Sequence, residues 1–104
     1  MADRARGRTP HGITLSSART TIRNQLGLHA RPAMAFVDAA SRFECEVHVR
    51  RTDGDEVVDG KSIMQMLLLA ATQGTELEIV CNGPDAESAL SALLALVESR
   101  FDED

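Results

Sequence analysis

The sequence predicts an α+β domain, a β-α-β-β-α-β-α open-faced sandwich in which three helices cover one face of a four-stranded antiparallel sheet. Segments with an apolar residue at every second position alternate along the chain with segments whose apolar residues recur at helical spacing. The intervening positions of the alternating segments are largely charged. This pattern is typical of an antiparallel sheet with one face in water and the other under helices.

The first strand is expected over residues 16–23, where apolar and polar residues alternate. A loop over residues 24–28 follows, and Gly27 can supply an unusual backbone angle at its end. A helix should then begin close to His29, because apolar residues recur at helical spacing beyond it. These apolar positions are Ala33, Phe36, Val37 and Ala40.

A hairpin is predicted in the middle of the chain. Residues 44–50 have the cleanest alternation in the sequence. The Asp53-Gly54 pair is a typical hairpin turn, and residues 56–59 form a short, acidic return strand.

A second helix is predicted from the apolar run that begins at Ile63 and ends at Ala71. Ser62 and Gln65 have the spacing of a capping box, and Gly74 is a helix stop. A strand over residues 77–81 and a helix that starts after the Gly-Pro-Asp turn complete the order of elements. The apolar face of this last helix consists of Ala86, Ala89, Leu90, Leu93, Leu94 and Val97.

The length of 104 residues fits one domain. We expect residues 16–104 to form this domain and residues 1–15 to form a flexible N-terminal extension. The segment Phe101-Asp102-Glu103-Asp104 is expected to be an acidic tail.

The composition argues against several classes of partner and location. A formal net charge of −5 argues against non-specific binding to nucleic acid or to a membrane surface. There is no apolar run of membrane-spanning length and no apolar segment of a secretory signal, which predicts a cytoplasmic protein without membrane insertion. Cys45 and Cys81 lack metal-ligand spacing, so we expect buried side chains and no metal or other cofactor.

The segment Gly27-Leu28-His29-Ala30-Arg31-Pro32-Ala33 carries the strongest functional signal. It places a histidine at a helix start, with an arginine two positions later. The first-turn N–H groups of Ala30, Arg31 and Ala33 are expected to lack helical partners and to face the imidazole with the positive end of the helix dipole. Such a site favours an anion, and it suits a phosphoryl group held on the imidazole.

The order of elements and three segments resemble the HPr family of phosphocarrier proteins. The segments are the histidine segment, Gly60-Lys61-Ser62-Ile63-Met64 and Thr72-Gln73-Gly74-Thr75. The resemblance covers residues 16–104. It implies a carrier that accepts a phosphoryl group from enzyme I, itself charged by phosphoenolpyruvate, and passes it to an enzyme IIA protein or domain. His29 matches the phosphoryl acceptor and Arg31 the supporting arginine.

Ser62 has two predicted roles. As a helix cap it would accept a hydrogen bond from the backbone of Gln65. The resemblance also implies regulatory phosphorylation of Ser62 by HPr kinase, an event separate from the histidine chemistry. The Gly60-Lys61-Ser62 segment is not a nucleotide-binding loop, because that motif needs a glycine where this chain has Asp55.

The second predicted helix is apolar nearly all round, so part of it should be exposed as a protein-binding face. We expect Ile63, Met64 and Leu67 to contact partners. In the family, this helix and the histidine helix together form the docking surface for enzyme I and enzyme IIA. The chain is expected to be a monomer.

Two outputs and two rival functions remain open. The two possible outputs are sugar uptake and the regulatory, nitrogen-related branch of the family. The C-terminal segment and the Ala33-Met34 pair look like the nitrogen-related branch, whereas the Ser62-Ile63-Met64 segment looks more like serine-regulated carriers. One rival is an interaction module that acts through phosphorylated Ser62 without sugar transport. The other is a small hydrolase or transferase that uses His29 as a general base, although the motif contains no second catalytic group. We therefore expect a carrier and not a stand-alone enzyme.

Overall fold

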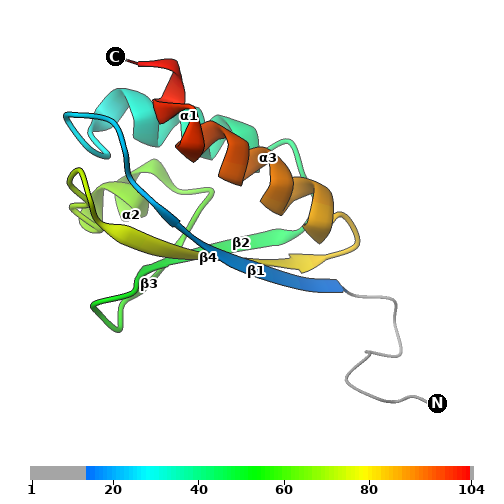
Figure 1. Ribbon diagram of the computed structural model, residues 1–104. Helices are drawn as coiled ribbons and strands as arrows, with labels where there is room; N and C mark the ends of the chain where they lie inside the picture. Colours follow the sequence, from blue (N-terminus) through cyan, green and yellow to red (C-terminus); the bar gives the residue numbers. More distant parts are fainter. Residues whose placement is uncertain (1–13, 104) are drawn as a thin grey trace.

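The computed structural model describes residues 14–103 and contains four strands, three α-helices and a short 3₁₀ turn (Figure 1). The order is β1 (Thr14–Thr21), α1 (Ala30–Ala40), β2 (Glu46–Arg51), β3 (Val57–Asp59), α2 (Ile63–Leu68), β4 (Glu76–Gly83), α3 (Ala86–Glu98) and η1 (Arg100–Asp102). This order confirms the predicted sequence of strands and helices.

The strands form one sheet in the order β1-β4-β2-β3, and each neighbouring pair is antiparallel. Ile79 on β4 lies opposite Ala18 on β1 and Val49 on β2. All three helices lie on one side of the sheet, which leaves the other side open (Figure 1). The predicted open-faced sandwich is therefore confirmed.

The core lies between the helices and the covered face of the sheet. On β2 the covered face is buried at Val47 and Val49, whereas Glu46 is exposed and His48 and Arg50 are half-buried. The helices contribute one buried face each. The largest fully buried apolar side chains are Phe36, Ile22, Met66, Leu77, Ile79, Leu93, Val47, Val49, Val58 and Val97.

The first strand begins earlier than predicted. Thr14 and Leu15 pair with Gly83 and Asn82 of β4, so these two residues belong to the sheet and not to the N-terminal extension. The rest of the predicted flexible extension, residues 1–13, lies outside the described residues.

The second helix ends earlier than predicted, at Leu68 instead of near Ala71. Its end is fixed by contacts from distant parts of the chain. Nη1 of Arg51 donates to the carbonyl oxygens of Leu69 and Ala70, at 3.1 and 3.2 Å, and Ala70 turns the backbone with a φ of +49°. Leu69 and Ala71 thereby become buried after the helix has ended.

The C-terminal segment is not a free acidic tail as far as residue 103. Arg100, Phe101 and Asp102 all have positive φ values, of 59°, 54° and 59°, although none is glycine. Left-handed backbone costs roughly 1 kcal/mol or more per residue. This turn buries the Phe101 side chain, which is 7% exposed, and returns the chain toward α1. Asp104 lies outside the described residues.

None of the helices within residues 14–103 is long and apolar enough to cross a membrane.

Candidate functional site

His29 is the N-cap residue of α1, as the sequence predicts, with extended backbone angles of −82° and −169°. Its side chain is 38% exposed and makes no capping hydrogen bond to its own helix. The prediction for Ala33 is wrong, because its N–H donates to the carbonyl oxygen of His29 at 3.0 Å. The N–H groups of Ala30 and Arg31 have no backbone acceptor within residues 14–103, so two donors remain open at this helix start.

Gly27 holds the loop before α1 in place. Its φ is +72°, and a Cβ atom there would lie 2.6 Å from the carbonyl oxygen of Ala71. The close approach lets the Leu28 N–H donate to that same oxygen at 2.8 Å, while the His29 N–H donates to the Gly27 carbonyl at 3.0 Å. The segment after α2 therefore fixes the position from which α1 starts.

The imidazole of His29 contacts the C-terminal segment. Its Nε2 atom lies 3.3 and 3.2 Å from the two carboxylate oxygens of Glu103. The amide of Asn24, which is fully buried, donates from Nδ2 to the Gly27 carbonyl at 2.7 Å and to Glu103 Oε1 at 3.1 Å. Asn24 and Glu103 were not predicted as site residues. No local signal marks them, since one lies in a loop and the other in an expected tail.

Arg31 extends from the first turn of α1 and is exposed. Within the described residues its guanidinium forms no ion pair with a carboxylate. The structure thus brings Arg31 to the same helix start as His29 and leaves its side chain exposed to solvent.

Ser62 caps α2 as predicted. Its hydroxyl oxygen accepts a hydrogen bond from the Gln65 N–H at 3.2 Å. The other half of the predicted capping box differs, because the Gln65 side chain accepts from the Asp59 N–H at 2.9 Å instead of from Ser62. Ser62 belongs to a different helix start from His29.

The model of the family described as PTS HPr component phosphorylation site matches residues 16–99. This match covers most of the chain, including both helix starts. The chain belongs to the HPr family. Family members are phosphocarriers of the phosphoenolpyruvate-dependent phosphotransferase system, and this coarse role applies to the chain.

Similar proteins carry two names, HPr and NPr. Phosphocarrier protein HPr of Pseudomonas aeruginosa is 49% identical over 83 residues, which cover 80% of this chain and 91% of that protein. Phosphocarrier protein NPr of Escherichia coli is 41% identical over 83 residues, with the same coverage of 80% and 91%. A crystal structure of HPr from Thermoanaerobacter tengcongensis is 38% identical with a TM-score of 0.80 and covers 86% of this chain and 98% of that one.

Helices α1 and α2 and the loop before α1 expose a group of large apolar side chains, which we name the apolar face. Met64 is 74% exposed, as predicted, and Leu67 is 39% exposed. Ile63 differs from the expectation because it is half-buried and packs against the core. The apolar face consists of Leu26, Met34, Met64, Leu67 and Leu68.

The side chain of Lys61, in the Gly60-Lys61-Ser62 segment, is already engaged in a hydrogen bond. Nζ of Lys61 donates to the Phe43 carbonyl at 2.7 Å, and its backbone N–H donates to Asp59 Oδ1 at 2.9 Å. The lysine therefore ties α2 to the end of α1, in agreement with the rejection of a nucleotide-binding loop.

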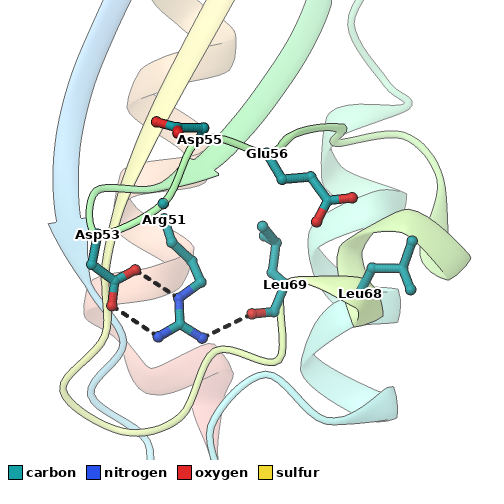
Figure 2. A pocket seen from close by; sticks show the side chains of 7 residues that line it. Arg51, Asp53, Asp55, Glu56, Leu68 and Leu69 are labelled. Carbon is teal, nitrogen blue, oxygen red and sulfur yellow. Dashed lines mark hydrogen bonds and ion pairs between the residues drawn. The ribbon is translucent and has the colours of Figure 1, made fainter.

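A hollow of about 300 Å³ lies between the turn after β2 and the end of α2 (Figure 2). Arg51 crosses it and pairs with Asp53, which holds the pKa of that carboxyl below its usual value. The same guanidinium donates to the Leu69 carbonyl. Because Arg51 is already paired and Asp55 and Glu56 add negative charge, the hollow does not suit a phosphate.

The cysteines are buried free thiols, as predicted. Burial raises the pKa of Cys81 to about 12, and burial likewise raises the pKa of Cys45. Neither thiol is therefore suited to act as a nucleophile. No group of three potential metal ligands occurs among the residues that the structure describes.

Proposed function

We propose that this HPr-family protein accepts a phosphoryl group on His29 from enzyme I and passes it to an enzyme IIA protein or domain. The observation that carries the proposal is the open start of α1. A partly exposed imidazole lies there beside two N–H groups without a backbone acceptor and an arginine without a carboxylate partner, as far as the described residues 14–103 extend.

Phosphoryl transfer to His29 requires few groups besides those at the start of α1. A lone pair of the neutral imidazole attacks phosphorus, a new P–N bond forms, and the bond between phosphorus and the enzyme I donor breaks. The phosphoryl oxygens can then accept hydrogen bonds from the Ala30 and Arg31 N–H groups and from the Arg31 guanidinium, each contributing about 1.5–3 kcal/mol. An exposed, largely preformed site permits transfer in both directions, as a carrier requires.

The proposal is tested by incubating the protein with phosphoenolpyruvate and enzyme I at neutral or mildly alkaline pH and then measuring its intact mass. We expect one acid-labile phosphoryl addition on the wild type and none on His29→Ala. Arg31→Ala should slow the addition, whereas Arg42→Ala, which removes an exposed arginine beyond the other end of α1, should not. An unchanged addition on His29→Ala would place the acceptor elsewhere.

We further propose that the apolar face docks both enzyme I and enzyme IIA. Solvent-exposed methionines and leucines of this kind are typical of protein contact surfaces. Met64→Asp should slow transfer from enzyme I without changing stability. Leu15→Asp is the matched control, because Leu15 is 68% exposed on β1, away from α1 and α2. Equal rates for the two variants would exclude Met64 as a contact.

Ser62 is proposed as a regulatory site for HPr kinase. A phosphate there would add negative charge beside Met64 at the start of α2 and so alter partner binding more than folding. Ser62→Asp should slow transfer from enzyme I, whereas Ser62→Ala should not. Equal transfer by both variants would argue against regulation through this charge.

The nitrogen-related branch is a second candidate for the output, and the relatives named NPr favour it. The relatives named HPr favour sugar uptake. Rates of phosphorylation by enzyme I of each branch would separate the two outputs. Preference for one donor by tenfold or more would assign the branch.

A further inference from the structure

We propose that Arg51 is a positioning residue for the start of α1, and that it acts on His29 through the segment that follows α2. The inference rests on the proposed acceptor role of His29 and adds to it the last residue of β2. It starts from the hydrogen bonds that the Arg51 guanidinium makes to two separate parts of the chain.

The Arg51 guanidinium joins the turn after β2 to the end of α2 (Figure 2). Its Nε and Nη2 atoms donate to the two carboxylate oxygens of Asp53, at 2.9 and 3.0 Å. A bidentate pair of this kind fixes the orientation of a guanidinium. The Nη1 atom is thereby held against the carbonyl oxygens of Leu69 and Ala70, at 3.1 and 3.2 Å.

The backbone at Ala70 has a conformation that needs support. Its φ of +49° lies in the left-handed region, which is unfavourable for a residue with a Cβ atom. Such angles persist where surrounding contacts hold them. The carbonyl groups of Leu69 and Ala70 lie on either side of the rotatable bonds of Ala70, and both accept from the same nitrogen of Arg51. Arg51 therefore holds both ends of the turned residue.

The turned segment reaches the acceptor site at Ala71. The carbonyl oxygen of Ala71 accepts from the Leu28 N–H at 2.8 Å. The same oxygen is packed so closely on Gly27 that a Cβ atom there would lie 2.6 Å from it. His29 is the next residue after Leu28. A shift of Ala71 would therefore displace the backbone that carries the imidazole.

The other end of this segment is fixed separately. The Gly74 N–H donates to the Ile22 carbonyl at 2.8 Å, and the Ile22 N–H donates to the Thr75 carbonyl at 2.9 Å. Both contacts lie beyond Ala71 in the chain. The position of Ala71 thus also depends on the turn at Ala70 and on the guanidinium that holds it.

Hydrogen exchange of the full chain, followed by NMR at single amides, tests the inference without enzyme I. The Leu28 amide is the reporter, because it donates to Ala71, and the amides of β4 are the internal reference. Arg51→Met keeps an apolar stem and removes every donor. We expect it to speed exchange of the Leu28 amide about tenfold relative to β4. An unchanged ratio would overturn the positioning role.

Arg50→Met is the matched control. Arg50 donates to the Arg51 and Gly54 carbonyl groups in the same hairpin, and its printed partners among residues 14–103 do not include the segment after α2. This variant should leave exchange of the Leu28 amide unchanged. Ala70→Gly, added to Arg51→Met, should restore part of the protection, because glycine adopts a positive φ without steric cost.

Transfer rates from enzyme I give a second measurement. A displaced imidazole lowers the rate at saturating concentration of the carrier, whereas a weaker contact with enzyme I raises KM. We expect Arg51→Met to lower the saturated rate about three- to tenfold with KM unchanged, and Arg50→Met to match the wild type. A rise in KM alone would overturn the inference. If the wild type accepts no phosphoryl group, the proposed function fails, and exchange of the Leu28 amide still decides whether Arg51 holds the start of α1.

Discussion

At the start of α1 and again at the start of α2, a closely packed glycine lies two residues before the N-cap residue. The two N-cap residues differ in what their side chains do. Ser62 accepts a hydrogen bond from its own helix, whereas the His29 ring turns to Glu103 and leaves the first-turn N–H groups of α1 open. A capped helix start satisfies its donors internally, and an open one keeps them for an incoming anion. Under the proposed function, the start of α2 stabilises the fold, whereas the start of α1 binds the phosphoryl group.

The largest expected effect on stability comes from substitution of Gly27, the glycine before the open start of α1. Gly27→Ala would force a side chain into left-handed backbone at φ +72°, with its Cβ atom 2.6 Å from a backbone oxygen. We expect a loss of about 3 kcal/mol in the free energy of unfolding, together with slower phosphoryl acceptance.

Gly60→Ala is the matched change before the capped start. Its Cβ atom would lie 2.6 Å from Val47 Cγ1, a side-chain atom, and no positive φ is involved. We expect a smaller loss, about 2 kcal/mol, because a side chain can adjust more easily than backbone. Denaturant unfolding of both variants checks the order, and a greater loss for Gly60→Ala would contradict it.

Ser62→Ala should produce the next largest effect. Removing the hydroxyl leaves the Gln65 N–H without its acceptor, and such changes cost about 1 kcal/mol. The melting temperature should fall by roughly 4–8 °C for a domain of this size. Ser62→Thr, which keeps the hydroxyl, should restore most of the difference. An unchanged melting temperature in Ser62→Ala would show that water replaces the cap.

Local patterns predicted both helix starts well, because each start depends on residues within a few positions of it. The serine cap joins Ser62 to Gln65, and the histidine segment has Gly27 and Pro32 on either side of the start. Contacts from distant residues explain what was not predicted. Arg51 ends α2 early from across the chain, and the buried amide of Asn24 holds Glu103. Neither contact has a local sequence signal.

The start of α3 is a third helix start to compare. We expect its N-cap residue to make a smaller contribution to the free energy of unfolding, and one that depends on pH. The carboxylate of Asp85, its N-cap residue, accepts from the Glu44 and Cys45 N–H groups, both at 2.9 Å, instead of capping its own helix. The hydrogen bond from the Glu44 backbone, followed by that from Cys45, holds the pKa of Asp85 below its ordinary value. The folded protein thus binds this proton less readily than the unfolded chain does.

The stabilisation by Asp85 should therefore be complete above pH about 4 and be lost as the pH falls through the lowered folded pKa. Unfolding of the wild type and of Asp85→Asn at a series of pH values checks this. The wild type should be more stable at pH 7, and the two curves should converge in acid. Because the carboxylate is partly exposed, we expect a smaller difference than for Ser62→Ala. A difference that persists unchanged at low pH would contradict the assignment to ionised Asp85.

The smallest expected change in stability belongs to His29→Ala, the variant with the largest expected loss of function. The ring caps no helix and is 38% exposed, and its contact with Glu103 is only partly buried. Contacts of this kind contribute about 0–1 kcal/mol, so the free energy of unfolding should stay within about 0.5 kcal/mol of the wild type.

Parallel unfolding of His29→Ala and Ser62→Ala measures the contrast directly. A loss for His29→Ala as large as that for Ser62→Ala would mean that the imidazole supports the helix start, and the distinction between an open and a capped start would fail. A near-zero loss would mean that the first turn of α1 is held by Gly27 and the segment after α2, which leaves the imidazole and its neighbouring N–H groups available for the phosphoryl group.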